Sequence, residues 1–276
     1  MAIGGRLRDA AAMSSRRRDR GPTTPRHGVA RVISKLGLAS RTAAAQMVAD
    51  GRVGVNGRIV HNPEFPVRQG LDRIAIDGLL QAASSRLVLM LNKPRGLVTT
   101  ANDEAGRDTV YRCFEGAALP WLAPVGRLDK ASEGLLLFSN DPVWAAQITN
   151  PDSGPPKTYH VQVAALPDAA MLSAIARGVV QDGEHLTVRS VRVLRSAHKN
   201  AWLEIVLDEG RNRQIRRVLE ACGLRVLRLV RVAIGPLALG ALPKGRWRRL
   251  SDVEIASLQA QVKNRARRPS APPRTD

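Results

Sequence analysis

Residues 124–141 read Pro124-Val-Gly-Arg-Leu-Asp-Lys-Ala-Ser-Glu-Gly-Leu-Leu-Leu-Phe-Ser-Asn-Asp141. The apolar run from Leu135 to Phe138 is short and uninterrupted, and polar residues and glycine bound it on both sides. Such a run is typical of a buried strand rather than of a helix. Asp129 lies in the turn that begins at Gly126, directly before this strand. We therefore expect a rigid core to hold this loop, and loops held in that way often carry functional residues.

A lone Arg-x-Asp turn in a basic chain is usually a solvated surface turn, but here the wider pattern decides against that interpretation. The string Gly-Arg-Leu-Asp, followed by Glu-Gly-Leu-Leu-Leu and Ser-Asn-Asp, resembles the central motif of the RNA pseudouridine synthases, in the branch named for RsuA and RluB. In that family the aspartate of this turn is the catalytic residue, which would be Asp129. Members often have threonine before the Glu-Gly pair, and this chain keeps a hydroxyl there with Ser132.

Two further stretches resemble motifs of the same family. A strand predicted at Lys157–Val163 carries a Lys-x-Tyr pattern. A strand tyrosine is usually a packing residue, whereas the resemblance implies that Tyr159 stacks on the target base, a contact of about 1–3 kcal/mol. The stretch Glu209-Gly-Arg-Asn-Arg-Gln-Ile-Arg-Arg217 resembles the third motif. Its functional arginine would be Arg216, paired with the catalytic aspartate, because a nearby cation keeps a buried carboxylate ionised.

Several basic residues of this part are candidates for RNA contact. Lys93-Pro94, Gly96 and the run 98–100 resemble the family's first motif, whose basic residues lie beside the active cleft. Gly210 permits a tight turn before a helix predicted at Gln214–Cys222, and a helix start favours anions. The residues predicted to contact RNA here are Lys93, Arg127, Lys157, Arg211, Arg213 and Arg217. Leu229 or Val230, on a later strand, is predicted to pack against the target base.

Residues 29–78 are predicted to form a small module of two short helices and a twisted hairpin. Ser40 is placed to cap the second helix. Asn56-Gly57 between two apolar runs is the strongest short signal for a hairpin turn. Together with the runs 34–41 and 51–53, these features resemble the alpha-L RNA-binding domain first known from a small-subunit ribosomal protein. A solvated basic face is the alternative, and we favour RNA contact for the group Arg31, Lys35, Arg41 and Arg52.

Composition points to a polyanionic partner. The 276 residues carry a formal net charge of +19 and a pI of about 11.4, and arginine dominates the basic residues. Arginine favours nucleic acid because its planar fork grips phosphate and stacks on bases. Anionic lipid is the rival partner, but no basic amphipathic helix and no long apolar span is visible in the sequence. Cys113 and Cys222 fit neither a zinc spacing nor a disulfide framework, which favours free thiols in a reducing cytoplasm.

The predicted fold class is α+β, with a small alpha-L domain followed by a synthase domain built on a mixed, largely antiparallel sheet with flanking helices. Its strands include 186–194 and 201–207, and its helices include 167–177 and 252–263. The predicted domains are a disordered basic arm (1–28), the RNA-binding domain (29–78), a linker (79–85), the catalytic domain (86–262) and a disordered basic tail (263–276). The Arg- and Ser-rich start also faintly resembles a transit peptide, and Met13 is an alternative start.

The resemblance implies isomerisation of a uridine in ribosomal RNA to pseudouridine, with 23S RNA favoured. It implies ribosomal RNA or an assembling ribosomal subunit as partner, a cytoplasmic monomer, no membrane, and no metal or nucleotide cofactor. Two alternatives stay open: a synthase acting on tRNA or on several RNAs, and a noncatalytic ribosome-assembly factor. An aspartate-based hydrolase ranks last, because no partner carboxylate or histidine stands at a recognisable spacing.

Overall fold

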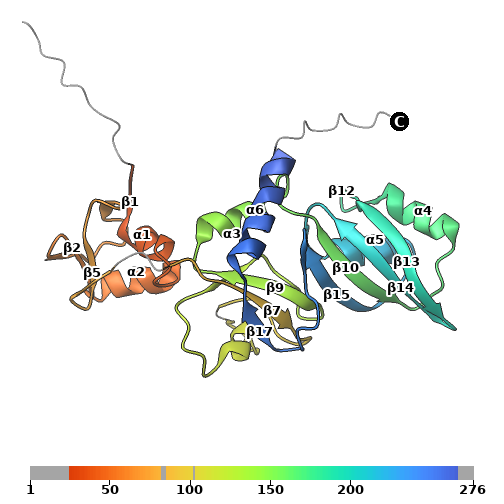
Figure 1. Ribbon diagram of the computed structural model, residues 1–276, viewed down its shortest axis with the longest axis horizontal. Coiled ribbons are helices and arrows are strands. Elements are labelled where there is room, and N and C mark those ends of the chain that lie inside the picture. The colour runs from red at the N-terminus through yellow and green to blue at the C-terminus, as the bar shows by residue number, and fades with distance from the viewer. Residues whose placement is uncertain (1–24, 82–84, 102, 267–276) are drawn as a thin grey trace, which may run out of the picture.

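The computed structural model describes residues 25–81, 85–101 and 103–266, which form two domains joined near residue 85 (Figure 1). The predicted arm and tail fall largely outside the described residues. Their inner boundaries were wrong by a few residues. Strand β1 (Arg26–Gly28) pairs with β4 (Pro66–Arg68) and so belongs to the first domain, and the last helix runs on to Ala266. No helix of the described residues is long and apolar enough to cross a membrane.

The first domain has the predicted helix pair and hairpin. Helix α1 (Val29–Lys35) precedes α2 (Arg41–Ala49), whose cap is the Ser40 hydroxyl, which accepts from the Ala43 amide at 3.0 Å. Strands β2 (Val53–Val55) and β3 (Arg58–Ile59) flank the predicted turn, where Asn56 and Gly57 both have positive φ. Strands β5 (Ile74–Ile76) and β6 (Leu79–Leu80) complete a four-stranded sheet, so the domain extends into the predicted linker.

The second domain is built on a nine-stranded sheet. The central order is β13-β14-β10-β15-β9-β7-β17, and only the β15–β9 pair on this path is parallel, which confirms a mixed, largely antiparallel sheet. The strands are β7 (Val88–Lys93), β8 (Ala123–Val125), β9 (Glu133–Ser139), β10 (Lys157–Val163), β13 (Ser190–Ala197), β14 (Asn200–Leu207), β15 (Val226–Ile234), β16 (Leu237–Ala238) and β17 (Trp247–Arg249).

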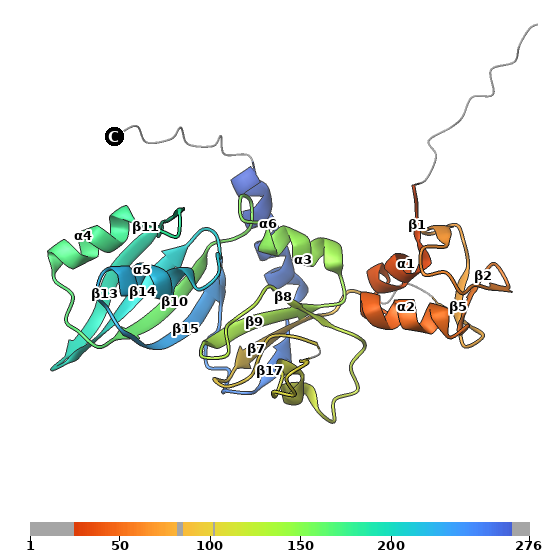
Figure 2. The ribbon, with the colours of Figure 1, turned by 180° about the vertical axis from the view of Figure 1, so that it is seen from behind.

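Helices cover both faces of the sheet, which explains why β9 is apolar at successive positions. On one face, Leu135 and Leu137 pack with α3 (Pro142–Thr149) and α6 (Asp252–Ala266). On the other, Leu136 and Phe138 join the core beneath α4 (Ala169–Arg177), α5 (Gln214–Ala221) and the 3₁₀ turn η1 (Val110–Phe114). Figure 2 shows the same layers from behind. Every residue of β9 is buried, so its leading loop is anchored in the core.

One predicted strand was wrong. Residues 186–194 do not form a single strand, because β12 (Glu184–Leu186) pairs back onto β11 (Val179–Gln181) and the chain turns before β13 starts at Ser190. Asp182 and Gly183 both have positive φ and form the hairpin turn between β11 and β12. An Asp-Gly pair is a strong hairpin signal, and the sequence therefore contained the information for this turn.

The two domains meet at a close contact between backbone and side chain. Gly37, in the loop between α1 and α2, has φ +72, and a Cβ atom there would lie 2.8 Å from the Cβ of Asn140. The Asn140 side chain accepts from the Leu87 amide at 2.8 Å and donates to the Ser85 carbonyl at 3.0 Å. Asn140 therefore holds the linker that enters the second domain and also contacts the first domain at Gly37.

Candidate active site and RNA-binding groove

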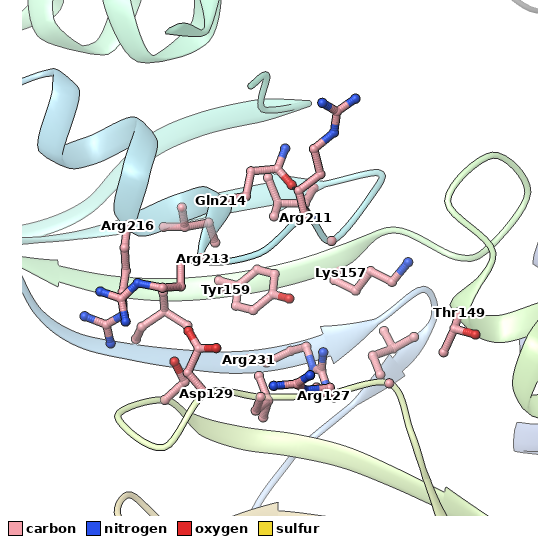
Figure 3. Close-up of a pocket in the computed structure, with 18 of the residues that line it drawn as sticks. Arg127, Asp129, Thr149, Lys157, Tyr159, Arg211, Arg213, Gln214, Arg216 and Arg231 are labelled. Atoms are coloured by element: carbon pink, nitrogen blue, oxygen red, sulfur yellow. Dashed lines mark hydrogen bonds between the residues drawn. The ribbon is translucent and has the colours of Figure 1, made fainter. Parts of the chain in front are cut away.

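A pocket of about 330 Å³ opens between the loop before β9, the strands β10 and β15, and the start of α5 (Figure 3). Asp129 lies on the loop, and Tyr159 lies across the pocket on β10. Elements that are far apart in sequence thus meet at one place. The predicted site residues that line the pocket are Arg127, Asp129, Lys157, Tyr159, Arg211, Arg213 and Arg216.

The loop that carries Asp129 is a tight turn with its carboxylate turned to the pocket. Gly126 has φ +78, and the Ser132 amide donates to the Asp129 carbonyl at 3.0 Å, which closes the turn. The Asp129 carboxylate itself has no hydrogen-bond or ion-pair partner within the described residues. Its oxygens are therefore available to a bound substrate.

Lys93 supports this loop from beneath. Its ammonium donates to the carbonyls of Pro94 at 3.2 Å, Asp129 at 3.1 Å and Ser132 at 2.9 Å, and its side chain is fully buried. Burial lowers the pKa of Lys93 to about 8, while the charge of Asp129 opposes the shift. The predicted RNA contact of Lys93 was therefore wrong: no surface of the residue is exposed, and it positions the Asp129 loop instead.

Two further contacts from the same segment fix the loop. The Thr99 hydroxyl donates to the Leu128 carbonyl at 2.7 Å and accepts from the Leu128 amide at 3.3 Å. The Gly96 amide donates to the Lys130 carbonyl at 2.8 Å. The sequence analysis missed Thr99, although its motif contains it. Hydrogen bonds to the backbone on both sides of Asp129 thus fix the position of the loop. Such preorganisation of a reacting group favours catalysis.

Lys93→Met should lower the rate of modification at saturating RNA by roughly 10–100-fold, because a misplacement of about 1 Å can cost 10²-fold. The methionine fills the space but removes the donor to three carbonyl groups, of which only that of Asp129 keeps the Ser132 amide as a donor. We therefore expect the loop to shift. The measurement is a single-turnover rate. Lys130→Met is the matched control, since Lys130 is exposed on the same loop. Equal rates for the two variants would remove Lys93 from this supporting role.

Arg216 reaches the same loop from α5, but its predicted pairing with Asp129 is not a direct ion pair. Its Nη2 donates to the Ala131 carbonyl at 3.3 Å, and its buried Nε has no partner within the described residues. Burial lowers the pKa of Arg216, the charge of Arg213 adds to the shift, and Asp129 opposes it. Arg216 thus holds the loop through a hydrogen bond and attracts the Asp129 carboxylate electrostatically without touching it.

Tyr159 and Leu229 form the apolar floor of the pocket. Both are buried, and both line the pocket from adjacent strands. Val230 pairs with His160 in the sheet register, and His160 alternates with Tyr159 on β10, so Val230 lies on the opposite sheet face. Of the two aliphatic residues predicted to meet the base, only Leu229 faces this pocket.

The arginines of the predicted third motif separate into two groups. Arg211 and Arg213 are exposed and line the pocket. Arg217 does not line it, because it pairs with Asp182 at 3.2 Å and Glu184 at 2.5 Å on the β11–β12 hairpin. Gln214, which sequence analysis did not single out, is buried and donates to the Thr187 carbonyl at 2.8 Å. The geometry gives Arg217 a structural partner in place of phosphate.

A second hollow, of about 580 Å³, lies between the two domains. Arg31, Lys35 and Arg41 line it from the first domain, and none of them takes part in an ion pair among the described residues. The facing wall is supplied by Ala146 and Gln147 of helix α3 and by Asn150 directly after it. We call this hollow the interdomain groove. Arg52, the fourth predicted contact, lies outside it and pairs with Asp77 at 2.6 Å.

Comparison with known families matches both domains. A model described as RNA pseudouridylate synthase matches residues 87–221, and a model of the S4 domain matches residues 29–72. The second match covers the helix pair and the hairpin of the first domain. The first spans the Asp129 loop, Tyr159 and the start of α5, while β15, which completes the pocket, lies beyond the matched residues.

Relatives resemble the chain over most of its length. An RNA pseudouridine synthase of Rickettsia bellii is 37% identical over 223 residues, covering 81% of this chain and 96% of that protein. Ribosomal large subunit pseudouridine synthase B of Bacillus subtilis is 33% identical over 232 residues, covering 83% of this chain and 94% of that protein. The crystal structure of a pseudouridylate synthase matches with a TM-score of 0.60 and 29% identity, covering 84% and 99% of the two chains.

Proposed function

The chain belongs to the RNA pseudouridine synthase family, and we propose that its substrate is a uridine of ribosomal RNA, with the large-subunit RNA favoured. The observation that carries the proposed chemistry is the Asp129 carboxylate, which has no partner among the described residues and faces Tyr159 across a pocket rimmed with arginine. The choice of ribosomal RNA is supported by the Bacillus subtilis relative, which is named for the large ribosomal subunit, and by the S4 domain.

In the proposed reaction the target nucleotide leaves its stack and enters the pocket, at a cost of a few kcal/mol. Tyr159 and Leu229 would hold the base, and stacking on the tyrosine would offset about 1–3 kcal/mol of that cost. Asp129 would act on the sugar. The C1′–N1 bond breaks and its electron pair leaves with the uracil. The carboxylate either forms an ester at C1′ or removes the C2′ proton.

The uracil then turns, and its C5 forms the new bond to C1′. If an ester formed, its C–O bond breaks as the new bond is made. If a glycal formed, the proton returns to C2′. The proton of C5 leaves and N1 gains one, so the product has the same atoms as the substrate. The proposed role of Arg216 is to keep the Asp129 loop in place through its hydrogen bond to the Ala131 carbonyl.

We also propose that the RNA runs from the interdomain groove to the pocket. Helix α3 contributes to both, because Ile148 and Thr149 line the pocket while Ala146 and Asn150 line the groove. The Gly37–Asn140 contact holds the first domain beside this helix. A strand of RNA bound along α3 would therefore meet the three cations of the groove before its uridine reaches Asp129.

Ala146→Glu should weaken RNA binding roughly tenfold, because it places a carboxylate between Arg31, Lys35 and Arg41 and competes with phosphate for them. The matched control is Ala170→Glu, an exposed alanine on the distant helix α4. Dissociation constants would be measured over a range of salt. Replacing the three cations with glutamine should reduce the salt slope by about two to three. Equal RNA affinities for the two glutamate variants would contradict the proposal that RNA binds in the interdomain groove.

The choice of substrate is tested with purified protein and three unmodified transcripts: 23S rRNA, 16S rRNA and a tRNA pool. We expect pseudouridine at one position of the 23S transcript, read by chemical mapping. Modification confined to 16S rRNA would correct the subunit. Modification confined to tRNA would overturn the ribosomal proposal while leaving the enzyme class in place.

A further inference from the structure

Arg231 is a buried cation that the proposed reaction has not yet used. It lies on β15, is 5% exposed and lines the pocket. Its Nε donates to the Leu135 carbonyl at 2.7 Å, which fixes the guanidinium against the sheet. Its buried Nη2 has no hydrogen-bond partner within the described residues. The side chain is thus fixed in place, while its Nη2 donor has no partner among the described residues.

The position of Arg231 places this donor beside the expected base. In the antiparallel β10–β15 pair, Arg231 stands opposite Tyr159, so the two side chains are neighbours on one sheet face. Lys157 lies two residues before Tyr159 and therefore points to the same face. It is 9% exposed and lines the pocket beyond the tyrosine (Figure 3). Two nearly buried cations thus flank the proposed stacking residue.

Neither cation has an acidic partner. Among the described residues no ion pair includes Arg231 or Lys157. Burial, together with the charges of Arg231 and Arg265, lowers the pKa of Lys157 to about 8, and the charge of Asp208 opposes this shift. Asp208 is itself engaged by Arg189 and Arg265. A buried charge without a counter-ion is destabilising. The pocket without substrate therefore lacks an anion that these two cations could bind.

We propose that Arg231, assisted by Lys157, donates a hydrogen bond to a negatively charged oxygen of the flipped nucleotide. This rests on the proposed function. Such an oxygen has two sources in that nucleotide. The first is the departing uracil, whose carbonyl oxygens take up the electron pair of the broken C1′–N1 bond until C5 bonds to C1′. The second is the phosphate. The place beside Tyr159, deep in the sheet, favours the uracil. Arg231 donates a hydrogen bond in this step and transfers no proton.

The first arm of the test compares leaving groups. Arg231→Met should slow the single-turnover loss of the target uridine about 100-fold, the usual cost of removing one donor to a developing oxyanion. With 5-fluorouridine at the target, the ring stabilises its own negative charge, so the same variant should lose less than about tenfold. Lys157→Met should show the same trend with a smaller defect. A variant that merely disturbs the fold would slow both substrates equally.

The second arm removes the phosphate charge and uses the wild-type protein as well. A neutral methylphosphonate replaces the phosphate beside the target uridine. If that phosphate is the partner, the methylphosphonate should weaken wild-type binding as much as Arg231→Met does, with no further loss when both changes are combined. If the uracil is the partner, the two losses should add.

Arg192→Met serves as control, since this arginine of β13 is exposed and pairs with Glu204 of β14 at 2.7 Å. Equal defects of Arg231→Met with uridine and 5-fluorouridine, together with additive losses in the second arm, would overturn the proposal. Wild-type activity on the unmodified RNA is measured first and tests the proposed function by itself. A wild-type protein that modifies the RNA while both arms fail would leave the function standing and the role of Arg231 refuted.

Discussion

Asp129→Asn is expected to abolish pseudouridine formation, with a loss of roughly 10⁴-fold or more. The amide keeps the shape of the side chain, but it neither attacks C1′ nor accepts the C2′ proton. Because the carboxylate has no partner within the described residues, its replacement breaks no hydrogen bond of the fold. Single-turnover assays with the purified variant provide the measurement.

RNA binding separates this result from a loss of substrate. Removing a negative charge from a basic pocket should leave affinity unchanged or slightly increased, because phosphate repulsion falls. A variant that binds RNA normally and still forms pseudouridine at more than a few per cent of the wild-type rate would exclude Asp129 as the reacting group. A variant that fails to bind would point to a structural role for the carboxylate.

Gly134→Ala should unfold much of the second domain or lower its melting temperature by about 10 °C or more. Gly134 has φ +103, and a Cβ atom there would lie 2.2 Å from the Arg231 carbonyl oxygen and 2.8 Å from the Arg231 nitrogen. These atoms belong to the parallel partner strand, so the alanine would have to push β9 and β15 apart. We expect a loss of roughly 4 kcal/mol or more, at about 2–4 °C of melting temperature per kcal/mol.

Gly96→Ala is the matched control. Gly96 has φ +102, but no atom of the described residues lies within 4 Å of an added Cβ. Its cost should be the backbone strain alone, about 1–3 kcal/mol. Thermal unfolding of the two variants therefore isolates the contact between the strands. Equal melting temperatures would show that Gly134 is required only for its backbone conformation.

Local patterns predicted most of the fold. The uninterrupted run of β9, the Asn56-Gly57 turn and the Ser40 cap each use short-range physics that the sequence displays. The cap of α3 was not predicted: Asp141 accepts from the amides of Val143 and Trp144. The misplaced 186–194 strand had a different cause. Apolar residues there follow a strand pattern, but the neighbouring Asp182-Gly183 turn pairs β12 with β11, so one strand ends at Leu186 and the next starts at Ser190.

Motifs predicted many of the residues that line the pocket, but Lys93 and Arg217 do not line it, and Arg231, which does, was not predicted. Lys93, Arg217 and Arg231 all read as basic residues of a basic chain. Lys93 donates hydrogen bonds to three carbonyls, and Arg217 forms ion pairs with two acids. Arg231 donates to one carbonyl and has a second donor without a partner among the described residues. Such roles depend on burial and on partners from other elements. The period-two spacing of Leu229 and Arg231 was the one local sign that Arg231 faces the pocket.

We propose that this protein makes pseudouridine in ribosomal RNA and that Asp129 is the reacting group. The decisive experiment maps pseudouridine in ribosomal RNA from cells that carry the wild-type protein, Asp129→Asn, or no protein. We predict one 23S position that is modified in the wild type and unmodified in both other strains. A position that stays modified in the Asp129→Asn strain and is lost only without the protein would contradict the role of Asp129. Identical maps in all three strains would contradict the ribosomal substrate.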